Sequence, residues 1–496
     1  MTSDEMRLPQ DGRADPARWL GMGEVVRLAV PTVLNMTGYT LMQFVDGVMV
    51  SWVGPEALSA QLGGGISAFT CMCFFLGTLS VVSTFASQNL GAGRPERGAR
   101  YGWQGLWLAW MAAAGLAPLI LLAPHFFGLL GHTAEVTRLE TQYFQIMLGG
   151  AVFLLSSRAL GSWFVGMHRP SVVLIAGVIA NTVNVVANWV LIFGHLGFPR
   201  LGLAGAGLGT VIGFLVELAI LGSVFLFSPL ASEFRTRQAW RLAGGAMRDL
   251  LRVGTPAGAM FLGELVMWTT FMVVIIGRLG TDAMAASAIL NRYFHLCFVP
   301  ALGVAAAVTA IVGRYCGAGR PQWAMRRAHA GFLLIECYMV AMGTVLWLGR
   351  DTLVSIFNGL QIQGGGPWGI TLAGTINDPD IQAMATSVFI FLLISQVFDA
   401  MNVTFIGALR GAGDTLWPGI AQLVLAYGLG LGGAAGVAWA RPEWGIAGPW
   451  LAVTCYIAVL GCVMWGRFLR GRWRTLRLVE SKAAPLVEDA AGLPPT

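Results

Sequence analysis

The pentapeptide Gly-Ala-Gly-Arg-Pro occurs twice in this 496-residue chain, at Gly91–Pro95 and at Gly317–Pro321, an offset of 226 residues (317 − 91). Upstream of each copy, an Arg-x-x-x-Pro element occurs at Arg27–Pro31 and again at Arg252–Pro256, an offset of 225 residues (252 − 27). The nearly equal offsets indicate an internal duplication. We therefore expect two halves that contain the same elements in the same order.

Long apolar runs surround both copies of the repeat. The chain is 56% hydrophobic and only 11% charged, with a mean hydropathy of +0.68, whereas soluble domains carry about 25% charged residues. So little polar surface cannot cover a body in water, and most of the surface must therefore face lipid. Basic residues in the loops between the apolar runs explain the net charge of +6, and we expect no nucleic-acid partner.

Twelve apolar runs are long enough to cross a bilayer, which takes about 20 mainly apolar residues. In the first half they are Val25–Trp52, Leu58–Ala86, Tyr101–Leu130, Glu140–Val165, Ser171–Leu196 and Leu203–Phe227. In the second half they are Leu250–Ile276, Ala285–Val312, Ala328–Leu348, Ile381–Leu409, Thr415–Trp439 and Gly448–Trp465. The predicted fold class is an all-α polytopic membrane protein whose twelve transmembrane helices form two pseudo-symmetric six-helix bundles.

The placement of arginine and lysine predicts the orientation. With both termini in the cytoplasm, 24 of the 31 basic residues fall in the tails and inside loops, five fall in outside loops, and Arg158 and Arg292 fall within spans. This bias follows the positive-inside rule, and an odd number of spans would break it. We therefore predict a multi-pass protein of the cell (inner) membrane with both termini cytoplasmic.

The repeat divides the chain into two parallel lobes, because an even number of spans separates its copies. The predicted regions are a cytoplasmic tail (1–24), an N-lobe (25–228), a cytoplasmic linker (229–249), a C-lobe (250–470) and a second cytoplasmic tail (471–496). Only 358–380 departs from the symmetry, and it is predicted to be an extracellular insertion. Parallel repeats suit alternating access, with a substrate site between the lobes near the membrane midplane.

The N-lobe carries polar residues inside its predicted spans. They are Asp46 in the first span, Asn181, Asn184 and Asn188 in the fifth, and Thr210 and Glu217 in the sixth. Spacings of three, four and seven place the residues of each span on one helix face. A carboxylate with amides and a hydroxyl is a hard-oxygen ligand set that suits a small cation or a protonation relay. The alternative is that the amides only hold helices together.

The C-lobe carries Glu264 and Asp399 in mid-span, with few basic residues nearby. Ionisable residues inside a span are costly and usually functional. A carboxyl group in such a place can exchange a proton for a cationic substrate. Arg292 is expected either to pair with one of these acids or to reach the outer interface, and the parts of Glu217 and Glu336 stay open.

In their order and spacing these residues resemble the multidrug and toxic compound extrusion (MATE) family, in its bacterial NorM-like branch. The features that carry the resemblance are Phe44-Val45-Asp46, Leu90-Gly91-Ala92-Gly93, Asn184-x-x-x-Asn188-Trp189, Gly205-x-Gly207-x-Gly209-Thr210, Glu264, and Phe398-Asp399-Ala400 through Leu409-Arg410-Gly411. The resemblance extends from about residue 27 to residue 470.

The resemblance implies two six-helix bundles around a V-shaped cleft, and antiport of drugs and organic cations against Na⁺ or H⁺. It places a cation or proton site of the N-lobe, with Na⁺ as its metal ion, at Asp46, Asn184, Asn188 and Thr210. It places an acidic pair of the C-lobe at Glu264 and Asp399. Two positions differ from some members of the family: Asn188 stands in place of an Asp and lowers the charge of its site, and Ser395 stands in place of a Tyr.

The predicted function is therefore secondary active antiport. Cationic or amphipathic organic compounds, such as drugs and toxins, leave the cell in exchange for H⁺ or Na⁺ by alternating access of the two lobes. The expected partners are small organic cations and membrane lipid, and we expect a monomer without a cofactor. The chain has no His-Glu-x-x-His, Gly-x-Ser-x-Gly or P-loop motif, so we do not expect an enzyme.

A lipid-linked oligosaccharide flippase of the same superfamily is the alternative. Such proteins usually have more spans and a strongly basic cavity for a pyrophosphate, whereas the candidate residues here are mostly acidic. Transport in vesicles separates the two, because ion flux driven by substrate indicates an antiporter and lipid scrambling without it indicates a flippase.

Overall fold

The computed structural model describes residues 21–355, 379–476 and 478–479. Within these ranges the chain is helical nearly throughout and contains no strand. Residues 1–20 and 480–496 of the predicted tails, and residues 358–378 of the predicted insertion, lie outside the described residues.

The helices follow one another with short connections. The first half contains α1 (Met22–Ser51), α2 (Pro55–Ser80), α3 (Val82–Gly91), α4 (Pro95–Gly128), α5 (Ala134–Gly149), α6 (Ala151–Gly166), α7 (Pro170–Phe193) and α8 (Leu203–Phe227). After α9 (Pro229–Glu233), the second half contains α10 (Gly244–Thr270), α11 (Thr281–Gly317), α12 (Pro321–Leu348), α13 (Arg350–Ser355), α14 (Pro379–Ala412), α15 (Leu416–Leu425), α16 (Gly433–Ala440) and α17 (Ala447–Leu469). Both pentapeptide loops end at a proline that begins a helix, where its missing N–H costs nothing.

Ten helical segments of the described chain are long and apolar enough to cross a membrane. The pair α5 and α6, which bends by 45°, makes an eleventh candidate. The remaining predicted span is α1, which has 30 residues. Polar residues along α1, such as Asn35, Gln43 and Asp46, lower its hydropathy. Length and composition thus support eleven of the twelve predicted spans, and a long helix occupies the place of the twelfth.

Several predicted spans are interrupted helices. The second span consists of α2 and α3, which meet at Val81, and the fourth consists of α5 and α6, which meet at Gly150. A π-helical segment, Ala426–Gly432, joins α15 to α16 in the eleventh span, and another, Phe271–Ile276, follows α10. Hydropathy does not detect these breaks, because the side chains stay apolar across them.

The helices pack into two lobes that exchange the first turns of their first helices: the start of α1 packs in the C-lobe, and the start of α10 packs in the N-lobe. One apolar core is formed mainly by the helices of the C-lobe, and it includes Val25 and Leu28 from the start of α1. A second core is formed by helices of the N-lobe, and it includes Leu250 and Val253 from the start of α10. A smaller third core, which includes Val50 and Ile192, also lies in the N-lobe. Each lobe is therefore anchored by a helix that continues into the other lobe.

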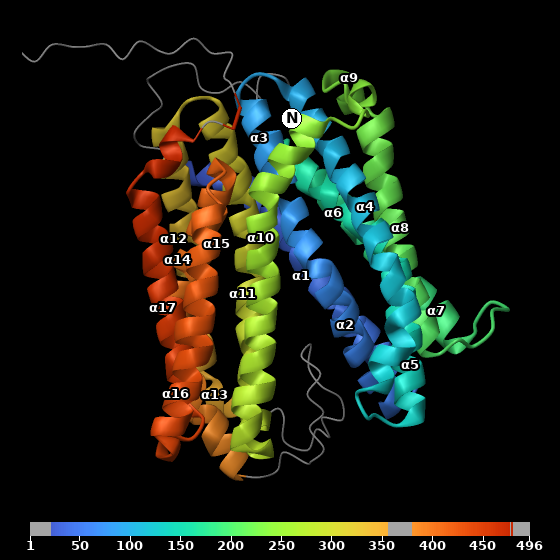
Figure 1. Cartoon of the computed structure of the whole chain (residues 1–496), viewed down its shortest axis with the longest axis vertical. Helices are drawn as coiled ribbons and strands as arrows, with labels where there is room; N and C mark the ends of the chain where they lie inside the picture. The colour runs from blue at the N-terminus through green and yellow to red at the C-terminus, as the bar shows by residue number, and fades with distance from the viewer. Residues whose placement is uncertain (1–20, 356–378, 477, 480–496) are drawn as a thin grey trace, which may run out of the picture.

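The two lobes meet at the end of the molecule that carries α9 and the start of α1, and they diverge toward the opposite end (Figure 1). α2 packs on α10, and α1 packs on α11. A Cβ on Gly77 of α2 would lie 2.8 Å from Gly258 Cα, and a Cβ on Gly303 of α11 would lie 2.7 Å from Val33 Cα. The repeat relates these two contacts, with offsets of 226 (303 − 77) and 225 (258 − 33) residues.

The pentapeptide loops form a second symmetric pair of contacts at the same end. Gly91 packs on the carbonyl oxygen of Arg314, and Gly317 packs on that of Gln88, so a Cβ at either glycine would overlap the opposite backbone. Both offsets are 226 residues (317 − 91 and 314 − 88). The third residue of each pentapeptide has a φ of +69°, which glycine adopts without strain. The duplication is thus visible in the backbone.

Hydrogen bonds reinforce this end of the interface. Thr84 Oγ1 donates to the carbonyl of Arg410 at 3.0 Å, and Gln88 Nε2 donates to the carbonyl of Gly411 at 2.9 Å. Both bonds join an N-lobe side chain to the C-lobe main chain. The loops that were predicted to be cytoplasmic, including both pentapeptide loops, contribute to this end of the molecule.

Candidate functional site

The first site lies inside the N-lobe, where α1, α7 and α8 face one another. Asp46 is 5% exposed, and Asn184 and Asn188 are fully buried. Asn188 Nδ2 donates to Asp46 Oδ1 at 2.6 Å, and Thr210 Oγ1 lies 3.5 Å from Asp46 Oδ2. Asn184 Nδ2 lies 3.5 Å from Thr210 Oγ1. The structure therefore brings together the four residues that were predicted to form this site, whereas their role in transport stays a prediction.

Glycines of α8 make this cluster possible. Gly209 faces the side chain of Asn188 so closely that a Cβ would overlap Asn188 Oδ1. A Cβ on Gly205 would lie 2.6 Å from the backbone of Leu191. Small residues let helices approach each other within a membrane, so the Gly-x-Gly-x-Gly-Thr run brings Thr210 to α7.

The chemistry of the cluster is that of one carboxylate among neutral groups. Asp46 accepts hydrogen bonds from an amide and a hydroxyl, and neither partner cancels its charge. Asn188 Oδ1 is buried and has no hydrogen-bond partner among the described residues. Together these oxygen atoms can hold a proton or coordinate one small cation.

Two further residues predicted for the N-lobe lie beside this cluster. Asn181 is half-buried on α7, and its Nδ2 is the atom nearest to Gly38 of α1. Glu217 is buried on α8, and its Oε2 lies 3.6 Å from Arg158 Nη2 of α6. Asp46 therefore has its hydrogen bonds with Asn188 and Thr210, not with Asn181.

The second site lies inside the C-lobe, where α10 packs on α15 and α14 packs on α17. Asp399 is 4% exposed, and Glu264 is half-buried. Gln422 Nε2 lies 3.3 Å from Glu264 Oε2, and Asn402 Nδ2 lies 3.4 Å from Asp399 Oδ1. The two acids lie within electrostatic range of each other. Glu264 and Asp399 therefore interact through their charges, and each has its own amide partner.

Several buried polar atoms on α14 and α15 have no hydrogen-bond partner among the described residues. They are Asp399 Oδ2, Asn402 Oδ1, Gln422 Oε1 and both amide atoms of Gln396. Buried polar groups are normally satisfied, and an unsatisfied one costs about 1–3 kcal/mol. The amide oxygen atoms of Asn402 and Gln422, each beside a carboxyl group, are suited to receive a cation.

The hydroxyl of Ser395 does not complete this pair. Its Oγ lies 3.2 Å from Thr454 Oγ1 of α17. A phenol approaches the acids from α17 instead, because Tyr456 is buried within electrostatic range of both Glu264 and Asp399. Tyr456, on a neighbouring helix, thus interacts with the charges of both acids.

Two other ionisable residues of the C-lobe stand apart from the acidic pair. Arg292 is exposed on α11 and forms no ion pair with Glu264 or Asp399. Glu336 is half-buried on α12, and its Oε2 has no partner among the described residues. Neither residue is part of the acidic pair.

The sequence interpretation missed four residues of the C-lobe site: Gln396, Asn402, Gln422 and Tyr456. Gln396 and Asn402 lie three residues before and after Asp399, on the same face of α14. The same spacing revealed the asparagines of α7, so it contained the signal for these two amides. Gln422 and Tyr456 belong to other helices, and their approach depends on how α15 and α17 pack.

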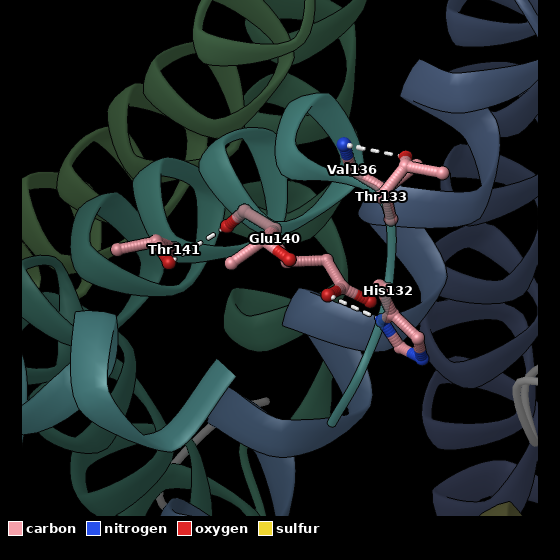
Figure 2. A network of polar contacts seen from close by, with 6 residues as sticks. His132, Thr133, Val136, Glu140 and Thr141 are labelled. Atoms are coloured by element: carbon pink, nitrogen blue, oxygen red, sulfur yellow. Dashed lines mark hydrogen bonds and ion pairs between the residues drawn. The ribbon is translucent and has the colours of Figure 1, made fainter. Parts of the chain in front are cut away.

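Another buried carboxylate lies toward the end where the lobes diverge. Glu140 of α5 is 2% exposed, and its Oε2 lies 2.9 Å from Nδ1 of His132 in the preceding loop (Figure 2). Thr133 caps the start of α5 by accepting from the N–H of Val136 at 3.4 Å. A Cβ on Gly63 of α2 would overlap Glu140 Oε1. The pair joins α5 to the loop before it, and the close contact of Glu140 with Gly63 packs α5 on α2, apart from the Asp46 cluster.

Comparison with known proteins shows that one family profile matches residues of both lobes. The MatE family profile matches residues 31–190 and 256–362, which is more than half of the chain. The chain is 29% identical over 455 residues to the probable multidrug resistance protein NorM of Mesorhizobium japonicum, covering 89% of this chain and 92% of that protein. It is 27% identical over 452 residues to the probable multidrug resistance protein NorM of Synechococcus sp., covering 90% and 93%.

Solved structures share the two-lobe fold. The eukaryotic MATE transporter AtDTX14 matches with a TM-score of 0.78 at 18% identity, over 91% of this chain and 96% of that chain. A MOP superfamily transporter from Pyrococcus furiosus matches with a TM-score of 0.80 at 19% identity, over 92% and 98%. These identities are low, so the similarity concerns the fold alone.

Proposed function

Because this chain belongs to the multidrug and toxic compound extrusion (MATE) family, we propose that it is an antiporter that exports organic cations in exchange for H⁺ or Na⁺. It is a multi-pass helical membrane protein of two lobes. The curated relatives reported above are named as multidrug resistance proteins. The cationic substrate, the coupling ion and the monomeric state are parts of the proposal.

The observation that carries this proposal is the position of the acids on the two exchanged helices. Asp46 lies on α1 and Glu264 lies on α10, and the first turns of these helices pack in the opposite lobe. A cation that binds at either acid therefore acts on a helix that is also part of the interface between the lobes. This connection is what an alternating-access transporter needs between its binding sites and its gate.

In this proposal, the coupling ion and the organic cation are exchanged because they compete for the same carboxylates. A proton or Na⁺ at Asp46 neutralises the one charge of the N-lobe cluster, and an organic cation neutralises the same kind of charge in either lobe. If the two cations bind in different states of the lobes, binding of one favours release of the other. The chain's own residues supply the carboxylates, the amide donors and the helices that move.

The orientation follows the distribution of basic residues. We propose that the end where the lobes meet faces the cytoplasm of a cell (inner) membrane, with both termini on that side. The arrangement of the lobes then corresponds to an outward-facing state, in which the cytoplasmic end is closed by the paired glycine contacts.

The decisive test is transport by the purified protein in liposomes. We expect efflux of a fluorescent cation such as ethidium to be driven by an imposed H⁺ or Na⁺ gradient, and we expect the substrate to drive the reverse flux of the same ion. Each gradient is imposed separately, with empty liposomes as the control. Ethidium movement that responds to neither gradient would contradict the proposal.

Labelling of single cysteines tests the orientation independently. In a variant without the seven native cysteines, a cysteine at exposed Phe198 should react with an impermeant reagent in intact cells, whereas a cysteine at Arg237 should react only after lysis. The reverse pattern would show that the lobes open toward the cytoplasm.

The flippase alternative has less support. The hydrogen-bond partners of Asp46, Glu264 and Asp399 are neutral amides and a hydroxyl, whereas a pyrophosphate needs cations at these positions. The curated relatives are named for multidrug resistance. Lipid scrambling in the same liposomes, without coupled ion flux, is the result that would favour it.

A further inference from the structure

An ion pair crosses the N-lobe beside the Asp46 cluster. Arg158 Nη2 of α6 lies 3.6 Å from Glu217 Oε2 of α8, and the side chains of these residues are 28% and 6% exposed. The guanidinium carbon of Arg158 lies 5.1 Å from the centre of the Tyr39 ring on α1. A carboxylate inside a membrane is costly without a counter-charge, and Arg158 supplies it.

This ion pair forms a second polar layer on the same helix faces as the Asp46 cluster. Tyr39 lies seven residues before Asp46 on α1, and Glu217 lies seven residues after Thr210 on α8. Seven residues are about two helical turns, or roughly 10 Å. Because α1 and α8 run in opposite directions, both steps lead toward the end where the lobes meet. Tyr39 lies within electrostatic range of Asp46 as well as of the ion pair.

The two layers differ in net charge. The hydrogen-bond partners of Asp46 are the neutral groups of Asn188 and Thr210, whereas the partner of Glu217 is a cation. The layer with Asp46 therefore carries one negative charge when the carboxyl is ionised, and the layer with Glu217 carries none. At 3.6 Å, the contact of Arg158 with Glu217 is longer than a hydrogen bond, so its effect is mainly electrostatic.

We propose that Arg158 sets which substrate charge the protein prefers, because it neutralises Glu217. With Glu217 neutralised, the N-lobe offers one carboxylate and therefore favours cations with a single charge. Without Arg158, a second carboxylate lies about two turns from Asp46, and a substrate with two separated positive charges gains a partner for each. This inference rests on the proposed export of organic cations, and it adds a rule for which cations are preferred.

Two inhibitors with the same carbon chain give a matched test. Hexyltrimethylammonium has one charge, and hexamethonium has a trimethylammonium group at both ends of a six-carbon chain. Each is added to liposomes that export ethidium, in a mildly alkaline buffer, and the two inhibition constants are compared. Their ratio reports the preference for one charge over two and cancels differences in the amount of active protein.

Arg158→Gln should shift this ratio toward hexamethonium on the order of tenfold, the size expected for one added charge about 10 Å away at an effective dielectric constant of about 20. Glu217→Gln should shift it in the opposite direction, because Arg158 then repels cations. The neutral pair Arg158→Gln with Glu217→Gln should return the ratio to the wild-type value, and Arg158→Lys should keep it. A purely structural pair would not give shifts of opposite sign.

The outcomes separate this inference from the proposed function. Wild-type protein that exports no ethidium would count against the proposed function itself. Wild-type export with the same inhibition ratio in all four variants would overturn the part assigned to Arg158. Arg158→Gln leaves Glu217 buried without a partner, which can prevent folding. In that case the inhibition ratios of Glu217→Gln and of the neutral double variant still test the proposal.

Discussion

The two lobes have the same arrangement of helices, but they differ in the hydrogen-bond partners of their buried polar groups. In the N-lobe, Asp46 is held by donors from two neighbouring helices, one of them at 2.6 Å. In the C-lobe, Glu264 and Asp399 lie near each other with amide partners at 3.3 and 3.4 Å. Further amide atoms on α14 and α15 have no partner among the described residues. The N-lobe thus gives both oxygen atoms of Asp46 a donor and leaves one amide oxygen, Asn188 Oδ1, without a partner among the described residues, whereas the C-lobe leaves more polar atoms in that state.

This difference shows that the duplication preserved contacts between backbones and not the chemistry of the sites. Gly91 and Gly317 make equivalent contacts, but the acids are not equivalent. Asp46 lies fifteen residues after Pro31, whereas Glu264 lies eight residues after the corresponding proline of α10. The difference of seven residues places the acids about two turns, or roughly 10 Å, apart in depth along their helices. A symmetric scaffold therefore carries two unlike groups of polar residues.

The largest effect is expected for Asp46→Asn. The amide keeps the size of the side chain and can still accept from Asn188, so the protein should fold, but it cannot hold a proton or attract a cation. Loss of a full charge at about 4 Å predicts a decrease in coupled efflux on the order of 100-fold or more. Glu140→Gln is the matched control, because Glu140 is equally buried in the same lobe outside the cluster. Near-normal efflux by Asp46→Asn would remove Asp46 from the mechanism.

Combining Asp46→Asn with Glu264→Gln tests whether the two lobes work in one cycle. Independent sites would give free-energy effects that add. We expect strong non-additivity, because every turnover passes through the same rearrangement of the lobes, and the double variant should be hardly worse than either single variant. The measurement is the rate of coupled efflux for all four proteins. Effects that simply add would mean that the lobes act separately.

A smaller effect is expected for Gly91→Ala and Gly317→Ala, and the loss of stability should be the same in both variants. Each new Cβ would overlap a backbone carbonyl of the opposite lobe, and overpacking of this kind costs about 1–3 kcal/mol. The thermal unfolding midpoint of the purified protein should fall by a similar amount in both variants. Gly115→Ala is the control, since nothing lies within 4 Å of its Cβ. Clearly unequal losses would contradict the symmetry of the interface.

The smallest effect on folding is expected for Gln396→Leu. Both amide atoms of Gln396 are buried without a partner among the described residues, so an apolar side chain of similar size should leave the unfolding midpoint unchanged or raise it. Coupled efflux should nevertheless fall, because α14 loses a buried amide about one helical turn from Asp399. Normal efflux would mean that Gln396 is no part of the site. A large loss of stability would instead reveal a structural role for the amide.

The sequence predicted the fold well because its signals are strong and local. Hydropathy located the spans, and the span predicted at Leu203–Phe227 coincides with α8. The breaks at Val81 and Gly150 escaped prediction, because apolar side chains continue across both. The grouping of Asp46 with Asn188 and Thr210 followed from spacing along helices and from the family resemblance.

Contacts between distant helices were harder to predict. Arg158 and Glu217 were both recognised as charges inside spans, but nothing in the sequence pairs α6 with α8. Tyr456 approaches the acidic pair from α17, and no spacing within one helix can reveal that. The exchange of leading helices also escaped prediction, because the start of α1 is as apolar as a helix that packs within its own lobe.

That exchange has a consequence for the order in which the protein is made. Val25, at the start of α1, lies in the core of the C-lobe, and Gly331 of α12 faces both Val25 and Val308. The ribosome must add 306 residues (331 − 25) before this packing is complete, which takes roughly 15–60 s at about 5–20 residues per second. Meanwhile the start of α1 is covered by lipid or by the insertion machinery, whereas α10 meets finished N-lobe partners as soon as it enters the membrane. The start of α1 therefore reaches its final packing only after most of the C-lobe has been synthesised.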